Sequence, residues 1–230
     1  MTANVPIATI DGPSSSGKGT ISRIVASRVG WNLLDSGALY RLVALGGSLR
    51  GVDPGSVESH VEIARSMQVQ FGSTADGQER VVLDGQDVTR RLRTEEAGAG
   101  ASRVAAWPAV RSALTDRQRA FAQPPGLVAD GRDMGTVIFP EAQLKVFLTA
   151  SADERAQRRH KQLIEKGSAA SLAALSREIA ERDLRDSTRQ IAPLKPAPDA
   201  HLLDSTGLSI EAVVEQVLSL GRERNLWPKV

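Results

Sequence analysis

The chain has 230 residues, of which 41% are hydrophobic and 24% charged, and its formal net charge is +2. These values are ordinary for a globular protein large enough to bury a full core. The small net charge and the low aromatic content of 3% argue against a nucleic-acid-binding protein. The absence of cysteine excludes disulfides, thiolate catalysis and cysteine–zinc sites.

Two further sequence features concern membranes and export. No apolar run approaches the about 18 residues of a membrane span. Residues 1–5 lack the basic region and apolar core of a secretion signal. We therefore expect a cytoplasmic protein with no membrane partner.

The first predicted strand, residues 6–10, leads into a glycine-rich loop and then into a stretch with helical periodicity from Lys18. Strand, loop and helix in this order form the context of a phosphate-binding loop. Glycines let backbone N–H groups converge on an anion, and a helix N-terminus favours negative charge. We predict a nucleoside triphosphate site made by Gly12, Pro13, Ser14, Ser15, Ser16, Gly17, Lys18, Gly19 and Thr20.

The loop departs from the commonest pattern, because Gly19 stands where a metal-binding hydroxyl usually follows the lysine. Thr20 comes one position later, so the protein ligand of a metal is missing or displaced. The Gly-Lys-Gly-Thr ending is typical of nucleoside monophosphate kinases rather than GTP switches. A glycine-rich turn that binds nothing is the alternative interpretation.

Apolar runs and helical patterns alternate along much of the chain, which favours an α/β fold with a parallel sheet covered on both faces. The predicted strands are residues 6–10, 31–34, 127–129, 144–148 and 201–203. The predicted helices between and after them are residues 18–29, 38–50, 109–121, 152–165, 172–184 and 210–222.

Residues 57–102 break this alternation. Residues 57–66 predict a short helix, residues 67–72 alternate apolar and polar side chains, and residues 81–83 lead into Asp84-Gly85. An Asp-Gly pair between short extended runs predicts a hairpin. We therefore expect an inserted subdomain with a small antiparallel sheet.

Two segments with polar side chains follow predicted strands, where ligands bind in doubly wound sheets. In the first, Arg41 is placed to contact a phosphate, and Ser36 either caps a helix or contacts a ligand. In the second, residues 130–136, Asp130 ends an apolar strand and suits Mg²⁺ or a lysine partner. A charged surface turn is the alternative for this second segment.

A third segment, residues 181–189, places Arg182, Asp186 and Arg189 on one helical face. A solvated helix with ion pairs is the plain alternative. However, the preceding predicted helix also begins with three arginines, Arg155, Arg158 and Arg159, and residues 169–171 join the two. Two arginine-bearing helices with a short connector predict a mobile lid that closes over phosphates.

Segments 10–20, 34–41, 129–136 and 181–189, with residues 193–194 and 203–206, resemble the bacterial cytidylate kinase family. The resemblance covers roughly residues 6–218. It implies a P-loop kinase fold with a five-stranded parallel sheet flanked by helices, an inserted monophosphate-binding subdomain and a short helical lid. It places the core at residues 1–56, 103–154 and 191–230, the insertion at 57–102 and the lid at 155–190.

The resemblance also implies the activity: transfer of the γ-phosphate of ATP to CMP or dCMP, with Mg²⁺, in pyrimidine nucleotide metabolism. Arg158 would lie near the donor adenine. The residues around cytosine would be Ser36, Ser102, Arg111 and Asp133. Those at the acceptor phosphate and ribose would be Arg41, Arg132, Arg189, Arg182 and Asp186. The catalytic residues would be Lys18, Arg132, Arg182 and Arg189, and the metal contacts Thr20 and Asp130, directly or through water.

Physical chemistry supports this division. A carboxylate such as Asp133 accepts a hydrogen bond from the amino group of cytosine and repels the carbonyl of uracil. The acceptor phosphate is mostly ionised at neutral pH, so direct in-line transfer needs no strong base and no covalent enzyme intermediate.

Two other functions fit parts of the pattern. A kinase of the same fold with AMP, UMP or shikimate as acceptor is disfavoured by Asp133 and Arg111. A nucleotide-binding switch without catalysis is disfavoured because no Asn-Lys-x-Asp guanine motif occurs. We expect ATP and CMP or dCMP as ligands, no nucleic-acid partner and a monomer.

Overall fold

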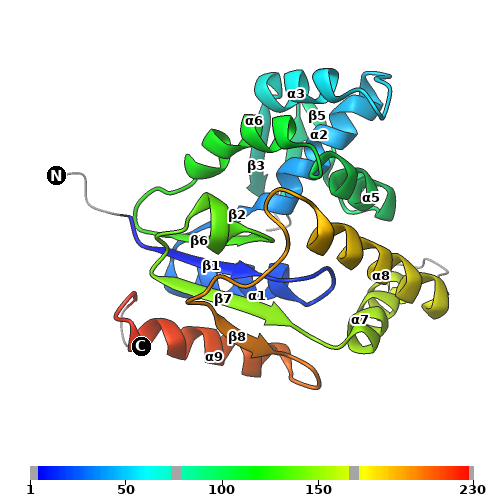
Figure 1. Ribbon diagram of the computed structural model, residues 1–230. Helices are drawn as coiled ribbons and strands as arrows, with labels where there is room; N and C mark the ends of the chain where they lie inside the picture. Colours follow the sequence, from blue (N-terminus) through cyan, green and yellow to red (C-terminus); the bar gives the residue numbers. More distant parts are fainter. Residues whose placement is uncertain (1–4, 74–78, 166–170, 228–230) are drawn as a thin grey trace. The chain divides into compact units, whose positions relative to one another are not determined.

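The structure is a computed structural model that describes residues 5–73, 79–165 and 171–227. The chain divides into two compact units. The first consists of Met1–Asp35 and Gln118–Val230, and the second of Ser36–Arg117. Figure 1 labels the elements of both units. The helices within the described ranges include none that is long and apolar enough to cross a membrane.

The first unit is built on a five-stranded parallel sheet in the order β2-β6-β1-β7-β8. This confirms the sheet that the apolar runs predict. Its strands are β1 (Ile7–Asp11), β2 (Asn32–Asp35), β6 (Leu127–Gly131), β7 (Leu144–Thr149) and β8 (His201–Asp204). In the central strand, Ile10 pairs with Asp130 on one side and Val146 on the other. Parallel strands end at the same edge, so the loops that follow them gather there.

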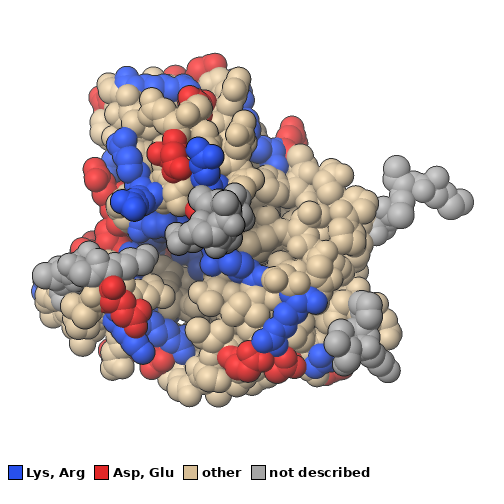
Figure 2. Space-filling view, turned by 180° about the vertical axis from the view of Figure 1, so that it is seen from behind, with Lys and Arg blue, Asp and Glu red and all other residues tan. Residues whose placement is uncertain are grey.

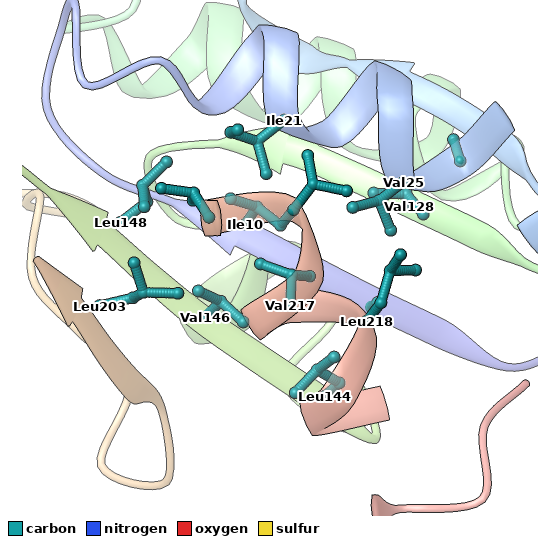
Figure 3. Close-up of a cluster of buried hydrophobic side chains, with 14 of the residues drawn as sticks. Ile10, Ile21, Val25, Val128, Leu144, Val146, Leu148, Leu203, Val217 and Leu218 are labelled. Atoms are coloured by element: carbon teal, nitrogen blue, oxygen red, sulfur yellow. The ribbon is translucent and has the colours of Figure 1, made fainter. Parts of the chain in front are cut away.

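Helices α1 (Lys18–Val29) and α9 (Ile210–Glu223) pack together over one face of this sheet. Figure 3 shows Ile21 and Val25 of α1 and Val217 of α9 around Ile10 of the central strand. Burying one such aliphatic side chain stabilises the fold by about 1.5–3 kcal/mol. The first unit also contains α7 (Ala152–Glu165) and α8 (Leu172–Thr188), which pack against each other.

The opposite face of the central strand carries Thr9 and Asp11, because alternate side chains of a strand point to opposite sides. After β6 the chain forms one π-helical turn, η1 (Met134–Ile138), against the first unit's sheet. A Cβ on Gly135 would lie 2.8 Å from Thr9 Oγ1 and 3.2 Å from Lys145 Cγ. Only glycine permits this close approach, so the turn lies directly on the strand.

The second unit combines helices with a small antiparallel sheet in the order β3-β4-β5. Its strands are β3 (Val69–Ser73), β4 (Glu79–Leu83) and β5 (Gln86–Asp87). Asp84 and Gly85 join β4 to β5 with positive φ angles of 49° and 82°, as a two-residue primed turn requires. The Asp-Gly hairpin prediction is therefore confirmed.

The helices of the second unit pack around α2. They are α2 (Ser36–Leu49), α3 (Val57–Ser66), α4 (Thr89–Leu92), α5 (Glu95–Val104) and α6 (Pro108–Arg119), whose last two residues belong to the first unit. A Cβ on Gly100 of α5 would lie 2.9 Å from Ala44 Cβ of α2. Small side chains therefore let these two helices approach closely.

Basic and acidic side chains lie next to one another on the face drawn in Figure 2. Within the first unit, Arg28 pairs with Glu211 and Glu215, and within the second, Arg50 pairs with Asp84. Such exposed pairs contribute about 0–1 kcal/mol each. The chain has 27 acidic residues for 29 basic ones, so many basic side chains can find an acidic partner.

Candidate functional site

The predicted phosphate loop lies between β1 and α1. A Cβ on Gly12 would lie 2.0 Å from the carbonyl oxygen of Leu148, so only glycine fits there. Ser15 and Gly17 have positive φ angles of 58° and 91°, and α1 begins at Lys18 without a side-chain cap. The turn therefore leaves the amides of the first helical turn without a capping side chain, as an anion site requires.

Lys18 is buried within the loop that it follows. Its Nζ donates a hydrogen bond to the carbonyl oxygen of Pro13 at 3.0 Å. Burial and, to a lesser extent, the Arg132 charge lower the pKa of Lys18 to about 7, although the Asp130 charge raises it. The lysine thus lies among charges of both signs, and an anionic ligand would favour its protonated form.

Asp130 offers a candidate contact for a cation. It is the last residue but one of β6 and pairs with Asp35 of β2, and burial raises the pKa of its carboxyl group to about 6 despite the Lys18 charge. Its Oδ1 is buried and has no hydrogen-bond partner among the described residues. Its Oδ2 lies 3.1 Å from where a Cβ of Gly19 would be. The unpartnered carboxylate oxygen beside the loop fits an oxygen-seeking ion such as Mg²⁺.

Nothing in the described ranges forms a metal cage of protein side chains. Groups of three or more His, Asp or Glu side chains able to hold a metal ion are absent from these residues. Thr20 lies in the first turn of α1, where its N–H donates to the Gly17 carbonyl oxygen at 3.0 Å. The arrangement therefore suits an ion that takes most of its ligands from phosphates and water.

Asp11, the last residue of β1, holds the turn that follows β6. Its Oδ1 accepts the backbone N–H of Met134, and its Oδ2 accepts that of Gly135, both at 2.8 Å. Burial raises the pKa of the Asp11 carboxyl group to about 7, while the two backbone hydrogen bonds lower it. The predicted site residues did not include Asp11.

Side chains of the third predicted segment, residues 181–189, contact those of the second, residues 130–136. Arg132 Nε donates to Asp186 Oδ2 at 2.9 Å, and Arg189 Nη2 lies 4.0 Å from Asp133 Oδ1. Helix α8 ends at Thr188, so Arg189 is its C-cap, with extended backbone, rather than a helical residue. The prediction of one helical face for this segment is therefore wrong at its last member.

Two arginines of α7 contact the phosphate loop. Arg155 is buried, and its Nη1 bonds the Ser14 carbonyl oxygen at 3.1 Å and Asp183 Oδ2 of α8 at 2.6 Å. Arg158 donates to the Ser16 carbonyl oxygen at 3.3 Å and to Ser205. Residues 166–168 and part of the predicted connector, residues 169–170, lie outside the described residues.

Sequence reasoning noted Arg155 among the lid arginines but did not place it in the site. Ser14, whose carbonyl oxygen it contacts, lies 141 positions away along the chain. The only sequence signal was its place at the start of an arginine-bearing helix after a strand. That signal is too general to identify a carbonyl partner.

Four predicted residues lie in the second unit. Ser36 begins α2, and Ser102 is buried on α5. Arg41 of α2 donates to the carbonyl oxygens of Leu92 and Thr94 at 3.0 and 3.1 Å.

The fourth, Arg111 of α6, is also buried. It donates to the Ala105 carbonyl oxygen at 3.3 Å, and its guanidinium carbon lies 5.6 Å from the centre of the Tyr40 ring. Backbone carbonyls and an aromatic face thus hold the guanidinium groups of Arg41 and Arg111 in place.

The first unit brings together the other predicted residues. Charges of Asp130, Arg132, Arg182 and Asp186 all act on Lys18. The triphosphate loop and the second and third predicted segments therefore share one region of the first unit. The first two of these segments follow the carboxyl ends of β1 and β6, where ligands bind in folds of this kind.

Comparison with known proteins agrees with the resemblance noted above. The family model described as cytidylate kinase matches residues 8–223. A cytidylate kinase of Stutzerimonas stutzeri (strain A1501) is 56% identical and covers 98% of this chain and 99% of its own length. A cytidylate kinase of Pseudomonas aeruginosa (strain LESB58) is 59% identical over 95% of this chain and 96% of its own length.

Among solved structures, a gluconokinase from Sinorhizobium meliloti 1021 aligns over 96% of this chain and 94% of its own. The identity is 16% and the TM-score 0.47. This distant likeness says nothing about the substrate.

Proposed function

This chain belongs to the cytidylate kinase family and so phosphorylates CMP or dCMP with ATP, and we propose how its residues divide that work. The reaction gives ADP and CDP or dCDP. The observation that carries the division is the loop at the end of β1, whose buried lysine shares one charged cluster with Asp130, Arg132 and Asp186.

We assign the donor triphosphate to the loop of residues 12–20. Supporting this assignment are the uncapped start of α1 and the positive φ angles of Ser15 and Gly17. Lys18 would exchange its hydrogen bond with the Pro13 carbonyl for one with the outer phosphates of ATP. Arg158, bonded to the loop at Ser16, would lie near the adenine.

We assign the acceptor to residues of both units. Arg41, Arg132 and Arg189 would contact the phosphate of CMP, and Arg182 and Asp186 the ribose. Asp133 would accept from the cytosine amino group, and Arg111 would donate to the cytosine carbonyl. By the family resemblance, Ser36 and Ser102 would also contact the base. A uracil carbonyl facing Asp133 would leave a buried carboxylate opposed by a second acceptor, which disfavours UMP.

Asp130 and Thr20 are the residues that would hold Mg²⁺, directly or through water. The unpartnered Oδ1 of Asp130 supports this choice. When bound, the ion supplies charge neutralisation for the phosphates of ATP.

The chemistry of this chain's residues is positioning and charge stabilisation. Lys18, Arg132, Arg182 and Arg189 would neutralise the charge that develops on the transferred phosphoryl group. The acceptor oxygen is already ionised near neutral pH, so no strong base is needed, and transfer is direct and in line. Closure of residues 155–190 as a lid would keep water from the γ-phosphate.

An acceptor panel tests this proposal. A coupled assay of ADP release with ATP and CMP, dCMP, UMP, AMP or shikimate should give the highest kcat/KM with CMP or dCMP. UMP should be used at least about tenfold less well, because one reversed hydrogen bond in a buried site has this order of effect. Failure with CMP together with turnover of another acceptor would overturn the proposal.

The variant Lys18→Ala is the matched probe for the loop within the same assay. We expect kcat to fall by about a hundredfold or more, as for other groups that stabilise transition-state charge. The variant should still fold, because the loop and α1 keep their backbone contacts, although the hydrogen bond to the Pro13 carbonyl and the charge interaction with Asp130 are lost. Near-normal turnover in this variant would contradict the assignment of the donor site.

We further propose that the enzyme works as a monomer in the cytoplasm. We propose no membrane or nucleic-acid partner for it, because its substrates are nucleotides.

A further inference from the structure

Asp11 is a buried carboxylate that none of the proposed roles uses. It is 5% exposed and directly precedes Gly12, the first residue of the phosphate loop. A buried carboxylate is costly unless hydrogen bonds or charges compensate it. Its position at the carboxyl end of the central strand makes its partners informative.

Both carboxylate oxygens of Asp11 have the same kind of partner. Each accepts one backbone N–H at 2.8 Å, from Met134 and from Gly135. These are the first two residues of η1, whose N-cap is Asp133 and whose N-cap side chain makes no capping hydrogen bond. Asp11 therefore caps the start of this turn from another strand, with one oxygen for each amide.

The turn held in this way directly follows the residues assigned to the acceptor. The Asp133 carbonyl accepts the N–H groups of Val137 and Ile138 at 2.9 and 3.2 Å, which fixes the backbone of Asp133 within the turn. Arg132 precedes it and pairs with Asp186 at 2.9 Å. A shift of η1 on the sheet would thus move both side chains.

The turn also packs tightly against the sheet face that carries Asp11. Gly135 lies against Thr9 Oγ1 and the stem of Lys145, with too little space even for a Cβ. The two hydrogen bonds of Asp11 and this close contact together define the height and register of η1 on β1.

We propose that Asp11 is a positioning residue that fixes Arg132 and Asp133 for the acceptor nucleotide, by holding the first two amides of η1. This inference rests on the proposed acceptor site. Asp11 touches neither substrate. It connects the donor loop to the acceptor segment. Its neighbour Gly12 begins the donor loop, and its side chain holds the turn that follows Arg132 and Asp133.

The variant Asp11→Asn tests the proposal with the least change in shape. An amide oxygen accepts one of the two N–H groups, while its NH₂ faces the other, so one donor opposes another. We expect the KM for CMP to rise by about tenfold or more, because small misplacements near reacting groups have large effects. The KM for ATP should change by less than about threefold, since the loop keeps its own backbone contacts.

A second readout is the preference for CMP over UMP, measured as the ratio of kcat/KM values. This ratio should fall in Asp11→Asn, because a displaced Asp133 no longer discriminates the amino group from the carbonyl. Asp199→Asn is the matched control. Asp199 is an exposed carboxylate that pairs with Lys145, whose stem also lies against Gly135, and its removal should leave both KM values and the ratio unchanged.

Thermal unfolding separates positioning from a purely structural role. If Asp11→Asn does not fold, Asp11→Ser, which leaves room for a bridging water, takes its place with the same expected split. Equal changes in both KM values, an unchanged CMP-to-UMP ratio, or failure of both variants to fold would each overturn the proposal. The wild-type panel distinguishes failure of the acceptor assignment itself, since the wild type must first prefer CMP.

Discussion

Burial and neighbouring charges shift the pKa of the Asp186 carboxyl group in opposite directions. Burial alone would raise the pKa of its carboxyl group, but the charges of Arg132 and Arg182 and the hydrogen bond from Arg132 lower it below its ordinary value. The folded state therefore favours ionised Asp186 more than the unfolded chain does. Stability from this group is present above the ordinary carboxyl pKa and is lost as pH falls through the lowered one.

Replacing Asp186 with Asn should make the protein less stable at pH 7, because Arg132 loses a charged partner. The difference from the wild type should shrink as pH is lowered towards 3, with a slope of at most about 1.4 kcal/mol per pH unit for one proton. Urea unfolding at several pH values measures both quantities. Glu211→Gln, which removes an exposed partner of Arg28, is the control and should leave the pH dependence nearly unchanged.

A constant difference between Asp186→Asn and the wild type from pH 7 to pH 3 would contradict this electrostatic account. It would mean that shape rather than charge explains the contribution of Asp186.

Single residues also set the limit of what the sequence predicts about the site. Lys18, Asp130, Arg132 and Asp186 were predicted from motifs, and the structure gathers them in one region. That Asp11 holds η1 was not predictable, because its partners lie 123 and 124 positions further along the chain. No periodicity or spacing encodes a contact between a strand end and amides that distant.

At the scale of elements, α7 and α8 both contact the phosphate loop. Arg155 of α7 bonds the Ala150 carbonyl, the Ser14 carbonyl and Asp183 of α8. The loop and α8 are thus joined through one buried guanidinium. Its planar, forked donors suit this role better than a lysine would.

Replacing Arg155 with Met should weaken ATP binding and destabilise the protein, because Asp183 loses its partner and the Ser14 carbonyl its donor. The loss should be about 2 kcal/mol, below the value for fully buried pairs because the Asp183 side chain is 25% exposed. Calorimetric titration with ATP and thermal unfolding measure the two effects. The double variant Arg155→Met/Asp183→Asn should regain part of the stability; no recovery would argue against an ion pair as the cause.

The helices show why some elements were predicted and others were not. Those predicted at residues 18–29, 57–66 and 152–165 have these bounds in the structure, since aliphatic periodicity or caps mark them. Helix α5 was missed because its buried positions carry mostly Ala, Gly and Ser, whose small side chains let it approach α2 but make its apolar face weak in the sequence. The π-helical turn η1 was missed because tertiary contacts with β1, not local preference, hold it.

On the scale of the whole molecule, the proposed acceptor residues are divided between the two units, whereas the proposed donor loop lies in the first alone. Arg111 belongs to the second unit, where it is buried against Tyr40. Substrate-specific kinetic effects should therefore follow this division of the chain.

The variant Arg111→Met tests this expectation. The KM for CMP should rise by about tenfold, since the buried guanidinium that donates to the cytosine carbonyl is lost and that carbonyl is left without a donor. The KM for ATP should stay within about threefold of the wild-type value. Steady-state kinetics with each substrate varied in turn gives both values, and equal effects on the two would contradict the assignment of Arg111 to the acceptor.

The residue ranges of the two units determine the order in which they are completed during synthesis. The second unit is one continuous segment, Ser36–Arg117, whereas β1 of the first unit pairs with β6 and β7, which begin at Leu127 and Leu144. On the ribosome, the second unit therefore emerges whole while the central strand of the first still lacks both neighbours. The apolar strand β1 therefore stays unpaired while more than a hundred further residues are synthesised. An unpaired apolar strand favours aggregation, so we expect the nascent chain to aggregate more readily than the folded enzyme.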